Sequence, residues 1–192
     1  MNFLAHLYLS GNDPEILVGN MMGDFVKGVL DDSYPPRITR GLELHRLIDS
    51  FAGRHPSFLA SKRRISPEYG HYRAVLVDLY YDHFLAVEWD RFAEEPFERF
   101  IATARQTMEE HAGILPERLR TRLPDIFTEW LPSYRNVDGV ATVLRRMAGR
   151  VGRPNPLGAG GDELVRHYGE LRSDFFQFLP DAKGYVATLI GR

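Results

Sequence analysis

Apolar residues recur every three or four positions along most of this chain, and no segment alternates apolar and polar residues with a period of two. The first pattern gives an α-helix one apolar face, whereas the second is typical of a half-buried β-strand. We expect helices over residues 14–30, 36–52, 66–92, 96–112, 136–150 and 162–178, shorter helical pieces cut by prolines between residues 114 and 134, and a glycine- and proline-rich connecting loop over residues 152–161. The sequence therefore predicts an all-α fold, with one compact helical bundle spanning residues 1–192.

Composition and charge narrow the class of protein. The chain has 192 residues, of which 44% are hydrophobic, so it can bury a sizeable core. It has no cysteine, which excludes disulfides and thiolate metal sites. The net charge of −2 disfavours general nucleic-acid binding, and no apolar run approaches the roughly 20 residues of a membrane helix. The N-terminus lacks the features of a signal peptide, so we expect a cytoplasmic protein that binds neither nucleic acid nor membranes.

Polar residues with metal-binding chemistry stand inside apolar segments. Three pairs are spaced four residues apart, which places both members on one helix face: Asn20 and Asp24, His45 and Asp49, and Asp78 and Asp82. His6 lies in the equally apolar segment FLAHLYL. The spacing alone is weak evidence, because 33 acids and histidines in this chain give about five or six such pairs by chance. Their apolar setting is more informative, because a buried carboxylate needs a partner or a metal ion.

The ligand types restrict which ion such a cluster would bind. Imidazole and carboxylate without thiolate suit Mn²⁺, Fe²⁺, Mg²⁺ or Zn²⁺ in a catalytic site rather than a structural zinc site. A divalent ion of this kind lowers the pKa of bound water from 15.7 toward about 7 and stabilises charge at a phosphorus centre. The alternative to metal binding is that each histidine is a structural residue of the core, held by hydrogen bonds.

Five segments, in order and at compatible spacings, resemble one enzyme family: MNFLAHLYLS, GNMMGDFVKG, LHRLID, DLYYDHFLAVEW and HYGELRSDFFQFLP. The chain is similar to acyl carrier protein phosphodiesterases over nearly its whole length, most strongly over the first 90 residues. The resemblance implies an all-α relative of the HD-domain phosphohydrolases that uses a divalent metal, with manganese favoured and magnesium or iron as alternatives. It implies hydrolysis of the phosphodiester of holo acyl carrier protein by metal-activated water, which releases phosphopantetheine and the apo carrier protein.

On this resemblance we assign roles to the polar residues. We expect His6, Asp24, His45 and Asp78 to bind the metal. Asp82 or His83 would complete this set or act as general acid and base, and Arg46 would bind the phosphate through its guanidinium group. Asn20 and Asp49 would orient the metal ligands. These roles cannot be transferred from the wider HD superfamily, because the chain has Asp82-His83 where that superfamily has adjacent His-Asp.

Basic patches at residues 61–65, 117–122 and 144–153 are candidate docking surfaces for the carrier protein, which is typically acidic. Two other functions stay open: an HD-type phosphohydrolase acting on a nucleotide or another small phosphate ester, and a non-catalytic helical binding module. A carboxylate-bridged di-iron bundle is disfavoured because it requires two Glu-x-x-His motifs, and the sequence offers only Glu163 followed three residues later by Arg166.

Overall fold

The fold consists of helices joined by turns. The computed structural model describes residues 2–190, and these residues contain no β-strand, so the all-α prediction is confirmed. No helix within this range is both long and apolar enough to cross a membrane. In chain order the elements are α1 (Phe3–Leu9), α2 (Pro14–Met22), α3 (Pro36–Ala52), α4 (Pro56–Arg64), η1 (Pro67–Tyr69), α5 (Tyr72–Val87), η2 (Trp89–Arg91), α6 (Phe97–Glu110), η3 (Ala112–Ile114), α7 (Glu117–Arg120), α8 (Leu123–Asp125), η4 (Ile126–Trp130), α9 (Leu131–Ser133), α10 (Val137–Arg150), η5 (Leu157–Ala159), α11 (Gly160–Arg166) and α12 (Tyr168–Ile190).

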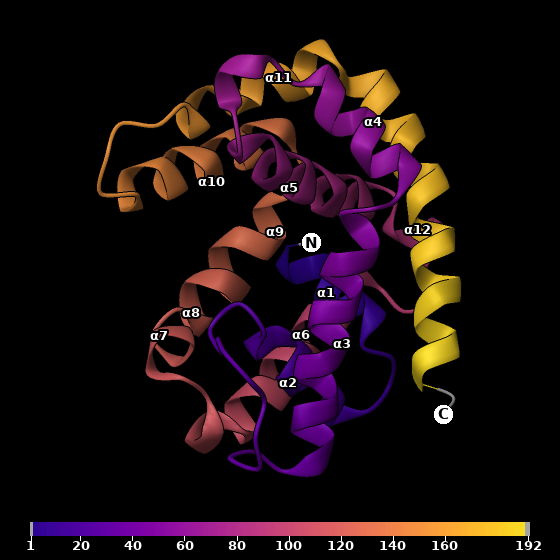
Figure 1. Ribbon diagram of the computed structural model, residues 1–192, viewed down its shortest axis with the longest axis vertical. Helices are drawn as coiled ribbons and strands as arrows, with labels where there is room; N and C mark the ends of the chain where they lie inside the picture. The colour runs from indigo at the N-terminus through magenta and orange to yellow at the C-terminus, as the bar shows by residue number, and fades with distance from the viewer. Residues whose placement is uncertain (1, 191–192) are drawn as a thin grey trace.

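Helix α5 is the central element of the core. Nearly all of its second half is buried, on every side of the helix, as expected for a helix that is apolar all round. It contacts α1, α4, α10 and α12, which surround it in Figure 1. The acids and the histidine of α5 are therefore held within the protein rather than on an outer face.

Helix α2 is shorter than the sequence indicates. The helical pattern predicts a helix reaching about Leu30, but α2 ends at Met22 and is capped by Gly23. Turns follow, and Gly28 adopts a φ of 88°, which is accessible to glycine without strain. As a result, Asp24 lies in the turn after α2 and is not on the same helix as Asn20.

Other boundaries also differ from the prediction. The segment predicted as one helix over residues 66–92 is divided by Gly70, whose φ of 50° interrupts the helical backbone before α5. The predicted final helix breaks at His167, after which α12 continues to Ile190 through an internal proline. Helices α1 and α4, of seven and nine residues, were not predicted from the sequence.

Two glycines allow α2 and α3 to pack closely. A Cβ atom on Gly19 would lie 2.1 Å from the carbonyl oxygen of Ile38, and one on Gly41 would lie 2.3 Å from the carbonyl oxygen of Ile16. Any side chain at either position would therefore push the two backbones apart. This close approach brings the backbone of Asn20 against α3.

Replacing Gly41 by alanine tests the importance of this packing. We expect Gly41→Ala to lower the free energy of unfolding by about 1–3 kcal/mol, as overpacking typically does. The matched control is Gly184→Ala on α12, where an added Cβ meets nothing within 4 Å; it should raise the free energy of unfolding by about 0.5–1 kcal/mol. Urea denaturation measures both changes. Equal stability of the two variants would show that α2 and α3 can separate without cost.

Candidate metal centre

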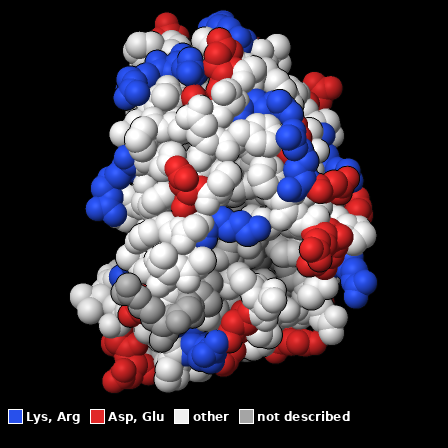
Figure 2. Space-filling view, turned by 90° about the vertical axis from the view of Figure 1, so that its right-hand side faces the viewer, with Lys and Arg blue, Asp and Glu red and all other residues white. Residues whose placement is uncertain are grey.

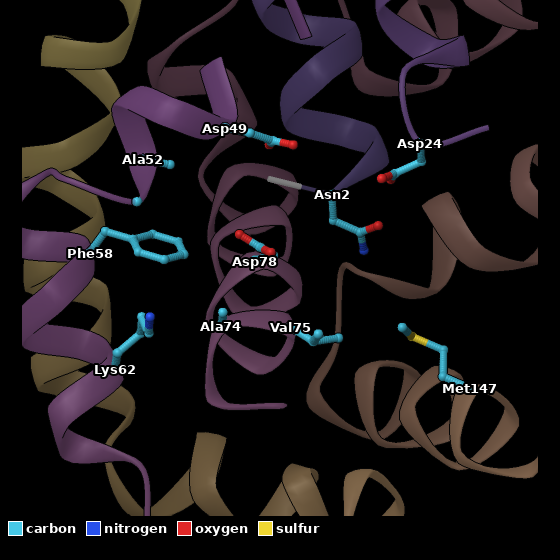
Figure 3. Close-up of a pocket in the computed structure, with 11 residues that line it drawn as sticks. Asn2, Asp24, Asp49, Ala52, Phe58, Lys62, Ala74, Val75, Asp78 and Met147 are labelled. Carbon is cyan, nitrogen blue, oxygen red and sulfur yellow. The ribbon is translucent and has the colours of Figure 1, made fainter. Parts of the chain in front are cut away.

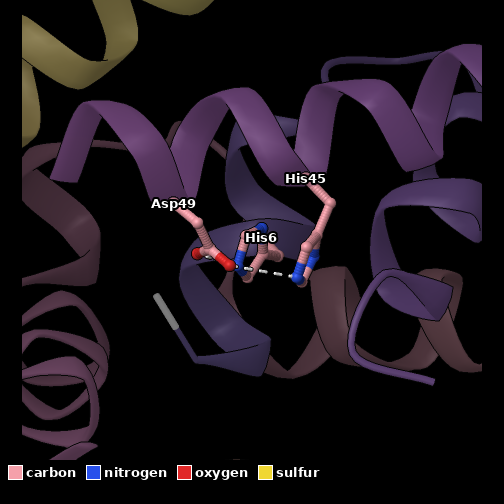
Figure 4. A group of neighbouring side chains, drawn as sticks. All are labelled: His6, His45 and Asp49. Carbon is pink, nitrogen blue, oxygen red and sulfur yellow. Dashed lines mark ion pairs between the residues drawn. The ribbon is translucent and has the colours of Figure 1, made fainter. Parts of the chain in front are cut away.

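Two histidines and one aspartate from α1 and α3 meet inside the protein. The His6 and His45 rings are stacked, with centroids 3.9 Å apart and planes inclined by 15°. The Nε2 atom of each ring lies 3.3 Å from a different carboxylate oxygen of Asp49 (Figure 4). Both histidines are buried, whereas the Asp49 side chain is 42% exposed. The three side chains place two ring nitrogens and a carboxylate within reach of one ion.

Asn20 fixes which ring nitrogen carries a hydrogen in each histidine. Nδ1 of His6 lies 2.8 Å from Oδ1 of Asn20, and Nδ1 of His45 lies 2.8 Å from the Asn20 backbone oxygen. Both oxygens only accept hydrogen bonds, so both Nδ1 atoms donate. The Asn20 amide is oriented in turn, because its Nδ2 donates to the His6 carbonyl and to Ser10. The two Nε2 atoms are therefore available as ligands, the usual arrangement of metal-binding histidines.

Gly23 gives His45 its place. A Cβ atom on Gly23 would lie 2.0 Å from Cγ of His45, so the imidazole ring packs directly on the backbone after α2. No other residue type leaves this space.

The protonation states of the three residues are compatible with the binding of a cation. Burial and the positive charge of His45 lower the pKa of His6 to about 4, so His6 is neutral. Burial also lowers the pKa of His45, but the Asp24 and Asp49 carboxylates outweigh burial and raise this pKa to about 9. Burial raises the pKa of Asp49, yet the neighbouring His45 and His6 bring it well below its usual range. Without a metal ion, a proton on His45 balances part of the carboxylate charge.

Further carboxylates surround a cavity of about 350 Å³ beside the histidines. Asp24, Asp49 and Asp78 line it, projecting from the turn after α2, from α3 and from α5 (Figure 3). Asp24 Oδ1 lies 3.8 Å from Nε2 of His45. Burial raises the pKa of Asp78, and the negative charges of Asp49 and Asp24 raise it further. Asp24 and Asp78 thus line the cavity next to His6, His45 and Asp49, but they do not belong to the group of three whose ligand atoms lie close together.

These residues fit a divalent cation. His6 Nε2 is buried and makes no hydrogen bond within residues 2–190, although Asp49 Oδ1 is 3.3 Å away. Because Nδ1 carries the hydrogen of His6, this contact joins a lone pair to a carboxylate, which is unfavourable unless a cation lies between them. Imidazole and carboxylate ligands suit a hard or borderline ion such as Mn²⁺, Fe²⁺ or Zn²⁺.

Asp82, for which the sequence predicted a catalytic or ligand role, does not line this cavity. Its two oxygens accept hydrogen bonds from the backbone nitrogens of Leu4, at 2.8 Å, and Ala5, at 2.9 Å. Asp82 therefore anchors the first turn of α1, where a carboxylate also interacts favourably with the helix dipole. Burial raises the pKa of Asp82 to about 7, although the two backbone donors lower it. Asp82 supports the helix that carries His6.

His83 and Arg46 also lie away from the predicted site. His83 is buried, with Nδ1 2.6 Å from the Tyr134 carbonyl and Nε2 3.1 Å from the Tyr168 hydroxyl, so both ring nitrogens are engaged in the core. Arg46 is exposed and donates to the carbonyl of Gly28 at 2.7 Å, which ties α3 to the loop after α2. Arg46 lines a different surface hollow from the one next to the histidines.

One cationic residue of the cavity was noted only as part of a basic patch. Lys62, on α4, lines the same cavity as the three aspartates, with Phe58 one turn earlier on that helix. The sequence could not assign Lys62 to the site because α4 itself was not predicted. Asp49, expected only to orient the ligands, is instead in contact with both histidines.

A second cavity, of about 440 Å³, adjoins the first and shares Asn2, Asp24, Val75 and Met147 with it. Aromatic and aliphatic side chains form much of its wall, and its basic members are Lys27, Arg118, Arg122 and Arg150. The two cavities therefore lie next to each other, and we refer to them together as the groove.

Comparison with known proteins was consistent with this chemistry. A family model described as acyl carrier protein phosphodiesterase matches residues 1–182. A protein of that name from Photorhabdus laumondii is 31% identical over 182 residues, covering 94% of this chain and 92% of the relative. Proteins of the same name from Pectobacterium atrosepticum and Escherichia coli are each 32% identical, over 94% of both chains. No solved structure matches the chain significantly, so the predicted likeness to the HD fold stays a prediction.

The charge state of His45 predicts how metal binding depends on pH. Below about pH 9, Nε2 of His45 carries a proton that an incoming ion must displace, whereas His6, with a pKa of about 4, is already deprotonated. We expect one proton to be released per Mn²⁺ bound, and the affinity to rise about tenfold per pH unit between about pH 6.5 and 8.5. Calorimetry in buffers of different ionisation enthalpy measures both quantities. An affinity that stays constant over this range would contradict the assignment of His45 as a ligand.

Proposed function

Because the chain belongs to the acyl carrier protein phosphodiesterase family, we propose that it hydrolyses the phosphodiester of holo acyl carrier protein and releases phosphopantetheine and the apo carrier protein. The observation that carries the proposal is the His6, His45 and Asp49 cluster at the edge of an acid-lined cavity. The family name gives the substrate, and the cluster gives a physical basis for a hydrolytic reaction.

We assign the metal to this cluster. Nε2 of His6, Nε2 of His45 and the Asp49 carboxylate would hold one divalent ion, with Asp24 and Asp78 as adjacent carboxylates. Manganese is the proposed ion, with magnesium or iron as alternatives. Such an ion supplies an acidified water and stabilises negative charge on the phosphate. Asn20 holds both imidazoles in the tautomer that this requires.

The remaining groups of the cavity would handle the phosphate and the proton. Lys62 is placed to attract the phosphodiester anion. In the reaction, the oxygen of water becomes bonded to phosphorus, the bond from phosphorus to the serine oxygen breaks, and that oxygen takes up a proton. Asp78, whose pKa is raised by burial, is the cavity acid best suited to carry this proton. Asp82 and His83, both engaged elsewhere, are no longer proposed for this role.

Removing one imidazole tests the centre. We expect His45→Gln to lower kcat/KM on holo acyl carrier protein by at least about 100-fold, because even indirect partners of metal ligands are worth 10–100-fold. His111→Gln is the matched control, since His111 contacts the carbonyl of Thr107 at the end of α6, away from both cavities. Mass spectrometry of the carrier protein measures loss of the prosthetic group, with Mn²⁺ and with chelator.

Three results of this experiment would each contradict the proposal. They are full turnover by His45→Gln, equal turnover in excess chelator, and cleavage of small phosphodiesters with none of holo carrier protein. The last of these would favour a phosphohydrolase that acts on a small ester.

We further propose that the acidic carrier protein docks over the adjoining cavity. Arg118 and Arg122 line this cavity, and neither forms an ion pair within the described part of the chain, so their charges are available to a partner. The face formed by α12 and α4 carries both signs of charge interspersed (Figure 2). Complementary charge of this kind mainly speeds association and sets its salt dependence.

Charge reversal at the cavity rim tests this docking surface. We expect Arg118→Glu with Arg122→Glu to raise KM for holo carrier protein about tenfold while changing kcat less than twofold, and to flatten the dependence of kcat/KM on salt. Arg99→Glu on α6 is the control, because Arg99 is exposed and lines neither cavity. An unchanged KM in the double variant would remove this surface from the proposal.

A further inference from the structure

The cavity next to the metal centre has the properties of a site for a mixed apolar and polar chain. Phe3, Phe25, Trp130 and Leu157 form apolar parts of its wall, and the cavity adjoins the acid-lined one at Asp24. A ligand whose phosphate lies at the metal centre can therefore extend into it without leaving the groove.

Trp130 supplies a donor without an acceptor in this cavity wall. The side chain is only 5% exposed, and its Nε1 atom is buried and has no hydrogen-bond partner within residues 2–190. A buried indole N–H normally has an acceptor. The other tryptophan of the chain follows this rule, because Trp89 Nε1 donates to the carbonyl of Glu95 at 2.8 Å. Because Trp130 also lines the cavity, a bound molecule can supply the acceptor that residues 2–190 do not.

The backbone and a neighbouring cation hold Trp130 in place. Trp130 ends η4, a five-residue π-helix, and single π-turns of this type are frequent at functional sites. The guanidinium carbon of Arg150 lies 4.7 Å from the centre of the Trp130 ring. The centres of the Phe3 and Trp130 rings are 6.0 Å apart. Arg150 and Phe3 thus pack against the indole, and its N–H has no hydrogen-bond partner within residues 2–190.

We propose that this adjoining cavity binds the pantetheine part of the substrate, with the indole N–H of Trp130 donating to an amide carbonyl of that chain. This inference rests on the proposed function for the identity of the ligand. A pantetheine chain is uncharged beyond its phosphate, carries a dimethyl-substituted carbon that suits the apolar wall, and has two amide carbonyls as acceptors.

Two variants test the subsite by different means. Val151→Trp fills the cavity, which Val151 lines, and Trp130→Phe removes the N–H while keeping an aromatic ring. We expect kcat/KM on holo carrier protein to fall at least about tenfold in Val151→Trp, and about three- to tenfold in Trp130→Phe, as for one hydrogen bond. Both losses should exceed those on methyl p-nitrophenyl phosphate, a diester without the amide chain. Val165→Trp, at an exposed position of α11, is the matched control and should behave as the wild type.

Direct binding separates this inference from the proposed function. Calorimetry with 4′-phosphopantetheine and the Mn²⁺-loaded protein should show binding that Val151→Trp weakens at least tenfold, and Mn²⁺ binding itself should persist in that variant. Addition of 4′-phosphopantetheine should also change the tryptophan fluorescence of the wild type and not that of Trp130→Phe.

The outcomes are distinct. If the wild type cleaves holo carrier protein and both variants match it on that substrate, the subsite is wrong while the proposed function stands. If the wild type fails to cleave holo carrier protein but binds 4′-phosphopantetheine in a manner sensitive to Val151→Trp and Trp130→Phe, the subsite stands and the proposed function fails.

Discussion

Asn20 makes the hydrogen bonds on which the candidate centre depends. Its side-chain oxygen holds Nδ1 of His6, and its backbone oxygen holds Nδ1 of His45, so one residue on α2 orients imidazoles from α1 and α3. This is possible only because α2 and α3 approach closely enough for Asn20 to reach both rings, which Gly19 and Gly41 allow. The orientation of both imidazoles therefore depends on the close packing of α2 against α3, and a change in this packing would alter that orientation.

The second constraint is electrostatic. The acids and histidines around the cavity present more hydrogen-bond acceptors than donors, and in a partly buried setting that imbalance costs free energy until a cation or a proton offsets it. His45 takes up the proton when no ion is bound. Helix α5 carries two acids in different situations. Asp78 lines the cavity, whereas Asp82 accepts hydrogen bonds from the backbone of α1. The acid that supports the fold and the acid that lines the candidate metal site are thus one turn apart on the same helix.

The groove explains why a hydrolytic centre of this type could be specific for a tethered substrate. Its acid-lined part provides for a metal ion and a phosphate, and its apolar part provides for an uncharged chain next to that phosphate. Basic side chains at the rim of the apolar part add long-range attraction for an acidic protein. In the proposed arrangement, chemistry, recognition of the prosthetic group and docking use separate residues, so each can be altered without loss of the others.

The sequence by itself determined the helical character of the fold, the family, and the residue types of the centre, because helical periodicity and polar residues in apolar segments are local properties. It could not determine which of those residues meet. Asp78 and Asp82 share a helix face, yet one faces a cavity and the other caps α1. His45 and His83 both lie in apolar segments, yet only His45 packs beside His6, while His83 is satisfied by Tyr134 and Tyr168. Helical spacing fixes the direction of a side chain relative to its own helix, but its partner depends on which other helix packs there, and only the tertiary structure decides that.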